Sequence, residues 1–141
     1  MDVERLYLLI GETLDYCQRI EHDVKLIYAG MRKGAMEDNL ELIKRWTLGE
    51  TIIALEELDN CDNNPYLKPR DYEILKNITK ERNYICHKCF NTYNYESNYD
   101  IQENRFNNAF NRINEFHNSL ERLWVLIEKV RLNVLSRYGR I

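Results

Sequence analysis

A chain of 141 residues with two prolines and five glycines has little turn material, which disfavours a multi-stranded sheet and suits one domain of long helices over residues 1–141. Its net charge of −3 disfavours broad electrostatic capture of nucleic acid, although a local anion site stays open. No run approaches the ~18 apolar residues of a transmembrane helix, and the N-terminus is no secretory signal, so we expect a soluble cytoplasmic protein without a membrane partner.

The first predicted helix has the clearest pattern. Apolar and small residues follow alternating steps of three and four, as on one face of a long helix: Val3, Leu6, Ile10, Thr13, Cys17, Ile20, Val24, Ile27 and Met31. We expect this helix to end near residues 30–34, where glycines and basic residues cluster. A shorter helix is predicted over 36–46.

Thr47 and Glu50 form the pattern of a capping box, which predicts that a helix begins here and ends near residues 59–60. Residues 60–69 are rich in Asn, Asp and Pro and are predicted to be a loop. The next long helix is predicted over residues 70–90.

Residues 91–100 lack helical periodicity and are predicted to be a connection. The last helix is predicted over residues 101–137, where residues 123–127 are apolar on all sides and indicate burial by a second subunit. The long helices with short links predict an all-α fold, an antiparallel four-helix bundle with an extra short helix.

Arg82 is unusual for its predicted place on a helix. A helical projection puts it on the apolar stripe of the 70–90 helix, between Ile78 and Cys86, with no acid three or four residues away. An unpaired buried guanidinium costs several kcal/mol, so something must pair with it or use it. The structural alternative is that Arg82 extends to solvent or pairs with an acid of another helix.

Asn83 and His87 lie four residues apart along one edge of this helix, beside Arg82. Histidine is the side chain best suited to proton transfer near neutral pH. Arginine supplies a permanent, forked cation for a phosphate or its transition state. The three residues therefore predict a site for phosphate chemistry.

The segment Arg82-Asn83-Tyr84-Ile85-Cys86-His87 resembles the motif of the HEPN superfamily, an arginine, a polar residue and then a histidine on a helix of a small all-helical chain. The resemblance implies a homodimer in which two motifs meet across a cleft and cleave an RNA substrate through its 2′-hydroxyl, without a metal or cofactor. It implies that Arg82 and His87 are catalytic and that Asn83 orients substrate or partner groups.

Many members of this superfamily are toxins of toxin–antitoxin or anti-phage systems, and some have a nucleotidyltransferase partner that modifies a tyrosine near the histidine. Here Lys88 and Cys89 follow His87, so the usual His-x-Tyr arrangement is absent, although Tyr84 and Tyr93 are near in sequence. The sequence thus predicts an endoribonuclease. The alternatives are a non-catalytic dimeric module of the same architecture that binds a nucleotide or a partner protein, and a purely structural helical protein.

Tyrosines next to the motif are candidates for substrate contacts. Tyr84, Tyr93 and Tyr95 are predicted to bind substrate, because aromatic rings beside a phosphate site can stack on single-stranded bases. The alternative is that the tyrosines of residues 91–100 fold over the end of the bundle. A zinc site built on Cys86, His87 and Cys89 would lack a second cysteine pair, so no metal is predicted.

Other titratable residues have simpler interpretations. His22 and His117 are predicted to be structural. The C-terminal Lys129, Arg131, Arg137 and Arg140 either favour the negative end of a helix dipole or form an anion-binding patch, and the sequence leaves both open. Cys17, Cys86 and Cys89 continue apolar stripes and are predicted to be buried and reduced.

Overall fold

The computed structural model describes residues 1–141 and confirms the all-α class. Its six helices are α1 (Val3–Met31), α2 (Met36–Ile43), α3 (Leu48–Asp59), α4 (Pro69–His87), α5 (Asn91–Asn94) and α6 (Tyr99–Arg137). Helix α2 is shorter than predicted, and the short α5 lies inside the predicted connection. None of the helices has the length and apolar character needed to cross a membrane.

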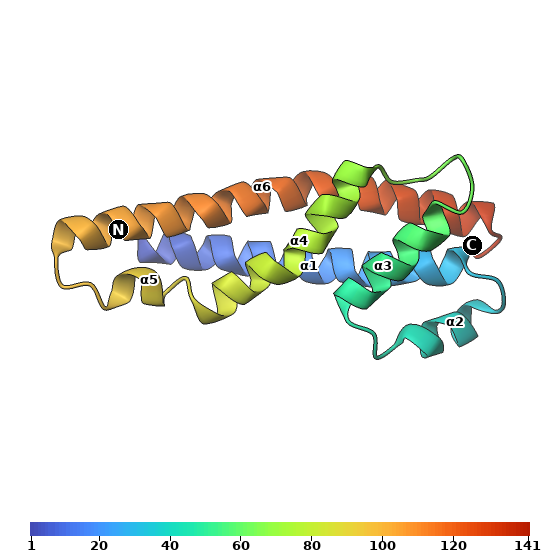
Figure 1. The fold of residues 1–141 in the computed structure, drawn as a ribbon, viewed down its shortest axis with the longest axis horizontal. Coiled ribbons are helices and arrows are strands. Elements are labelled where there is room, and N and C mark those ends of the chain that lie inside the picture. The colour runs from blue at the N-terminus through green and yellow to red at the C-terminus, as the bar shows by residue number, and fades with distance from the viewer.

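The long helices α1 and α6 lie side by side and run in the same direction (Figure 1). The amino group of Met1 pairs with Glu103 at one end, and Gly30 at the other end packs against Val134 and Leu135. The expected antiparallel arrangement therefore does not describe this pair. The reason is that the chain returns through α4 and α5 to the N-terminal end of α1 before α6 begins.

The core follows the predicted apolar stripe of α1 and a similar stripe of α6. In α1, eight of the nine stripe positions are buried and Val3 is half-buried. In α6 the buried residues also recur mostly at steps of three and four, from Phe106 to Val134, and Trp124 is half-buried beside the buried Leu123. Because so many apolar side chains are buried between α1 and α6, the seam between these helices supplies much of the hydrophobic stabilisation of the fold.

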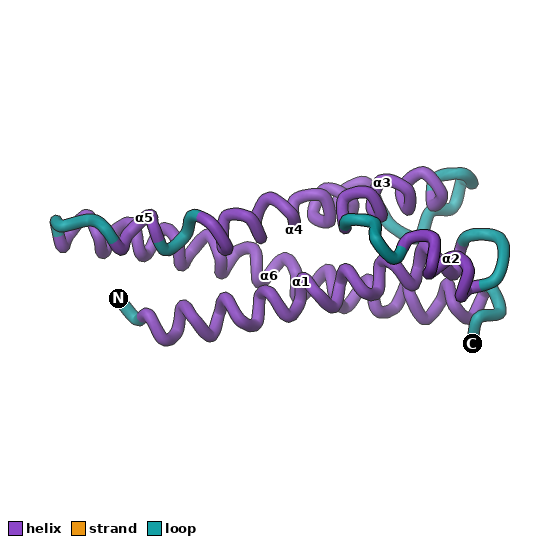
Figure 2. Tube along the Cα trace, turned by 90° about the horizontal axis from the view of Figure 1, so that it is seen from below, coloured by secondary structure: helices purple, strands orange, loops and turns teal.

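Helices α3, α4 and α5 follow one another along one side of the α1–α6 pair (Figure 2). Two contacts show that α4 runs opposite to α1. Arg82 in α4 contacts Glu21, and Phe90, just beyond the C-terminal end of α4, packs against Tyr7 near the N-terminal end of α1. Figure 1 shows that α4 runs opposite to α6 as well. The antiparallel arrangement thus holds for α4 but not for the α1–α6 pair.

Local signals set the helix ends. Thr47 Oγ1 accepts a hydrogen bond from the backbone N–H of Glu50 at 3.1 Å, which confirms the predicted N-cap of α3. Pro69 occupies the first turn of α4, where its missing N–H is no loss. Asn98 caps α6 by accepting from the N–H of Ile101 at 3.1 Å.

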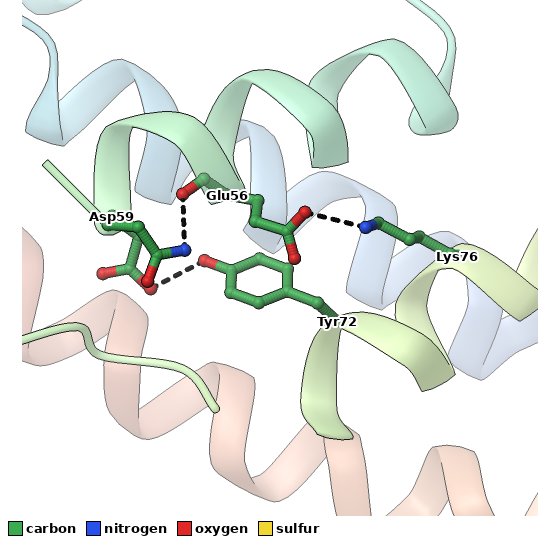
Figure 3. A network of polar contacts seen from close by, with 5 residues as sticks. Glu56, Asp59, Tyr72 and Lys76 are labelled. Carbon is green, nitrogen blue, oxygen red and sulfur yellow. Dashed lines mark hydrogen bonds and ion pairs between the residues drawn. The ribbon is translucent and has the colours of Figure 1, made fainter. Parts of the chain in front are cut away.

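Asp59 organises the connection between α3 and α4 (Figure 3). Its buried carboxylate accepts hydrogen bonds from the N–H groups of Tyr66 and Leu67 at 2.8 and 3.1 Å, and from the Tyr72 hydroxyl at 2.6 Å. Burial and this bond raise the pKa of Tyr72. Because the Asp59 carboxylate accepts from two donors in the loop and one in α4, it fixes the position of the loop and of the start of α4 relative to the end of α3.

Arg140 fastens the C-terminus to the end of α1. Its guanidinium donates to the carbonyl oxygens of Gly30, Arg32 and Gly34 at 3.2, 2.9 and 2.9 Å. Gly30 lies in the last turn of α1, where carbonyls have no intrahelical partner, and Arg32 and Gly34 follow the helix end. Gly34 adopts a φ of 102°, a left-handed conformation that suits glycine in this tight return.

Two other basic residues of the C-terminal region also have partners inside the chain. Arg131 pairs with the buried Asp23 at 3.5 Å, and Arg137 donates to the Tyr66 hydroxyl at 2.9 Å. With Arg140 they are committed to structural contacts, which favours the structural interpretation of this region over an anion-binding patch.

Replacing Asp59 with alanine should destabilise the protein strongly. The substitution leaves three donors around a buried position without their acceptor, which should lower the free energy of unfolding by about 3 kcal/mol or more. Urea unfolding followed by far-UV circular dichroism measures the loss. Asp62→Ala is the matched control, since Asp62 accepts only from the nearby Asn64 N–H on an exposed loop. Equal stabilities of the two variants would contradict this account.

Candidate functional site

The buried face of α4 differs from the predicted stripe. The buried residues are Tyr72, Leu75, Ile78, Glu81, Tyr84 and Ile85. Arg82 lies between the buried Leu75 and Ile78 on the helical projection and is half-buried, whereas Cys86 is exposed, so the predicted stripe is wrong at Cys86. The buried arc is wider than one stripe because α4 packs against α1, α3 and α6.

Arg82 forms an ion pair with Glu21 of α1. The Nη1 atom of Arg82 lies 3.0 Å from Oε2 of Glu21, and the two side chains keep 29% and 27% of their surface exposed. The predicted structural alternative, pairing with an acid of another helix, is therefore what the chain contains. This contact uses one of the five N–H donors of the guanidinium, so the ion pair orients Arg82 and leaves donors for a further oxygen ligand.

His87 and Asn83 lie on the outer side of α4 and are exposed. His87 is the last residue of α4. Its position, one turn beyond Asn83, matches the predicted edge. The chain thus presents an imidazole and an amide to solvent on the helix that also carries Arg82.

The predicted substrate-binding tyrosines have three different environments. Tyr93 is 1% exposed and packs edge-on against Phe106, so its ring has no free face and the base-stacking prediction is wrong for it. Tyr84 is buried beneath the guanidinium of Arg112, and burial raises the pKa of Tyr84. Tyr95 is 86% exposed and is free to contact a ligand.

Glu81, Tyr84 and Arg112 form a cluster that the sequence did not predict. The carboxylate of Glu81 accepts two hydrogen bonds from Arg112 of α6, at 3.0 and 3.1 Å. The Arg112 Cζ atom lies 3.6 Å from the centre of the Tyr84 ring. The bond to Glu81 also raises the pKa of Arg112. Paired at its edge and stacked on one face, this guanidinium is held in a fixed plane.

The sequence carries only a weak signal for this cluster. Glu81 lies next to Arg82, and a charged residue there suggests a pair with some other helix. Arg112 flanks the apolar stripe of α6 at Ile113, but nothing local assigns it to Glu81 rather than to solvent. Glu81 and Arg112 are 31 residues apart in sequence, so their pairing depends on how α4 and α6 pack against each other.

Two open hollows lie between α4 and α6, and Arg112 lines both. The larger, of about 710 Å³, has a mixed lining that includes Glu73, Lys80 and Glu115. The smaller, of about 510 Å³, is lined by Tyr84, Asn91, Thr92, Arg105, Asn108, Ala109 and Arg112, and no carboxylate is among them. The fixed guanidinium therefore stands at the junction of two solvent-accessible depressions.

The apolar residues 123–127 are partly covered by the chain itself. Leu123 and Ile127 are buried, and Trp124 packs against Tyr16 of α1. Val125 is 46% exposed on the outer side. Burial of this segment by a second subunit stays a prediction.

The two histidines predicted to be structural have different environments. His117 is buried, and its Nε2 atom lies 2.7 Å from Oε1 of Glu12, so it joins α6 to α1. His22 is exposed on α1. The chain brings together no group of three His, Cys, Asp or Glu side chains suited to a metal ion.

Comparison of the chain with protein-family models, with curated proteins and with solved structures finds no match.

The cysteines should divide into two reactive and two protected thiols. Burial raises the pKa of Cys17 to about 12 and that of Cys89 to about 11, whereas Cys61 and Cys86 are exposed, contrary to the predicted burial of Cys86. Because the thiolate is the reactive form, a thiol reagent at mildly alkaline pH should modify two cysteines in the native protein and four in denaturant. Cys61→Ser and Cys86→Ser together should leave no fast-reacting thiol, and rapid modification of that double variant would contradict the assignment.

Proposed function

We propose that the protein is a metal-independent endoribonuclease of the HEPN type, with Arg82 and His87 as its catalytic pair. The observation that carries the proposal is the pairing of two features on α4. Arg82 is oriented by Glu21 at 3.0 Å and retains free donors, and His87 is exposed five residues later, a rise of about 7.5 Å along the helix. These are groups that can bind a phosphodiester and move a proton beside it.

In the proposed reaction the 2′-hydroxyl of one nucleotide attacks the adjacent phosphorus. A bond forms between the 2′-oxygen and phosphorus, and the bond from phosphorus to the 5′-oxygen of the next nucleotide breaks. An imidazole accepts the 2′-hydroxyl proton, and an imidazolium returns a proton to the leaving 5′-oxygen. Arg82 stabilises the negative charge that develops on the non-bridging oxygens. The products are a 2′,3′-cyclic phosphate and a 5′-hydroxyl.

This reaction favours a site shared by two copies of the chain. The attacking and leaving oxygens stand on opposite sides of the phosphorus, so a single imidazole does not reach both. A homodimer around α4 and α6 would place a second His87 opposite the first and would bring two Arg82 side chains to one phosphate. An interface with two-fold symmetry makes such a pairing of identical motifs.

The remaining parts of the proposal follow from the resemblance to the HEPN superfamily. In this proposal, α1, α3, α4 and α6 are the four helices of the family's bundle. The protein acts in the cytoplasm as a toxin or anti-phage effector. An antitoxin or nucleotidyltransferase would then be its partner. Because Lys88 and Cys89 replace the usual x-Tyr after the histidine, control by tyrosine modification would need another tyrosine.

The test is RNA cleavage by the purified protein in excess chelator. The wild-type protein should cleave, and Arg82→Ala and His87→Ala should each lower the rate by about a hundredfold or more. That loss is typical of a general acid–base catalyst for His87 and of a group that stabilises transition-state charge for Arg82. His22→Ala is the matched control, since it removes an exposed histidine from α1 and should leave the rate unchanged. Light scattering of all four proteins checks that the dimer persists.

A non-catalytic binding module is the second candidate. Neutralisation of Arg82 by Glu21 favours it, because an arginine whose charge is already balanced stabilises a phosphoryl transition state less. If the wild-type protein leaves diverse RNAs intact in the same assay, this candidate replaces the ribonuclease.

A further inference from the structure

From the smaller hollow between α4, α5 and α6, we propose a subsite for one nucleotide of a single-stranded RNA, in which the base stacks on the outer face of Arg112. This inference deepens the proposed function, because it assigns a substrate contact beside the His87 motif.

Arg112 is prepared for stacking before any ligand arrives. Glu81 holds one edge of its guanidinium with two hydrogen bonds, and Tyr84 supports its inner face at 3.6 Å. The side chain is nevertheless 42% exposed, so Glu81 and Tyr84 leave part of the guanidinium accessible to a ligand. A flexible arginine loses conformational entropy when it binds, whereas this one has already lost it in folding, which improves its affinity for a flat partner.

The rest of the lining matches a nucleotide. Asn91 and Asn108 are exposed amides, and amides can donate to and accept from the edges of bases. Arg105, which Glu96 orients through a contact of 3.0 Å, adds a cation for a phosphate. The volume of about 510 Å³ lies in the range usual for small-ligand sites. A planar ring, polar edges and one negative charge are therefore what this hollow accommodates.

Two observations favour RNA over a protein side chain at this position. The only apolar contributors to the lining are Tyr84, which already lies beneath Arg112, and Ala109, so an aliphatic anchor would bury little apolar surface. The absence of a carboxylate from the lining favours an anionic ligand over a basic peptide. The larger hollow, which Glu73 and Glu115 line, is less suited to a phosphate backbone.

The hollow and the motif are close enough for one strand to reach both. Tyr84 lies three residues before His87, a rise of about 4.5 Å along α4. Tyr84 faces α6, and His87 lies on the exposed side of the same turn of helix. A nucleotide stacked on Arg112 would thus lie next to the nucleotide at His87 and would determine which bond is cleaved.

The test is binding of fluorescein-labelled 2′-O-methyl oligonucleotides, which lack the attacking hydroxyl, measured by fluorescence anisotropy. Arg112→Lys keeps the charge and removes the flat face, so the dissociation constant should rise about tenfold, as expected for loss of one stacked base. Arg122→Lys, at an exposed position of α6 outside both hollows, is the matched control and should bind like the wild type. Thermal melting checks that each variant is folded.

A second variant avoids the Glu81 pair. Asn108→Ala changes only an exposed amide and should alter the preference among oligonucleotides of the four bases. Salt dependence gives an independent readout: with one or two phosphates neutralised, the logarithm of affinity should fall with the logarithm of salt with a slope of about −1. A steep slope would indicate capture by many cations and would overturn the assignment.

Failure of this inference differs from failure of the proposed function. If Arg112→Lys and Asn108→Ala bind all four oligonucleotides like the wild type, or if the wild type binds none, the subsite is wrong, whatever the cleavage assay shows. If binding depends on Arg112 but the wild type does not cleave RNA in chelator, the subsite stands and the ribonuclease is wrong.

Discussion

The parallel seam between α1 and α6 is the constraint on which the rest of the structure depends. Apolar stripes determine which faces meet, but a continuous apolar seam tolerates sliding along its axis. Polar contacts remove that freedom, with Glu12 against His117 and Asp23 against Arg131. Burial raises the pKa of Asp23 while the Arg131 charge lowers it, and Arg131 Nε has no partner. A buried pair with such incomplete compensation adds little stability, so its main effect is on alignment.

Alignment of α1 with α6 in turn determines where α4 lies. Glu81 and Arg82 are consecutive, have opposite charge and point about 100° apart on the helix, so they reach different neighbours. Glu81 pairs with Arg112 of α6 and Arg82 with Glu21 of α1. A shift of α4 by one residue would exchange the two charges and oppose like with like. The two pairs therefore fix the rotation of α4, and with it the exposed position of His87.

Sequence patterns predicted the helices better than they predicted the site. The stripe of α1, the cap at Thr47 and the loop after residue 60 are local, and the structure has all three. The direction of α6 relative to α1 and the pair of Glu81 with Arg112 depend on contacts between distant segments, and no local pattern encodes them. The prediction that Cys86 is buried was wrong for a related reason. It assumed one buried stripe, whereas α4 contacts several helices and buries a wider arc that includes the paired Glu81.

The charge of the chain limits how it can hold an anionic partner. A net charge of −3 gives no broad basic surface, and three of the basic residues near the C-terminus are occupied by internal contacts. Counterion release from many phosphates is therefore a small term here. Affinity must instead come from directed contacts at fixed groups, such as Arg82 of α4 and Arg112 of α6, which the carboxylates of Glu21 and Glu81 hold in place. Arg82 lies on the side of α4 that faces α1, and Arg112 lies on the side that faces α6, so a bound strand that reached both would have to cross α4 near the turn that carries His87.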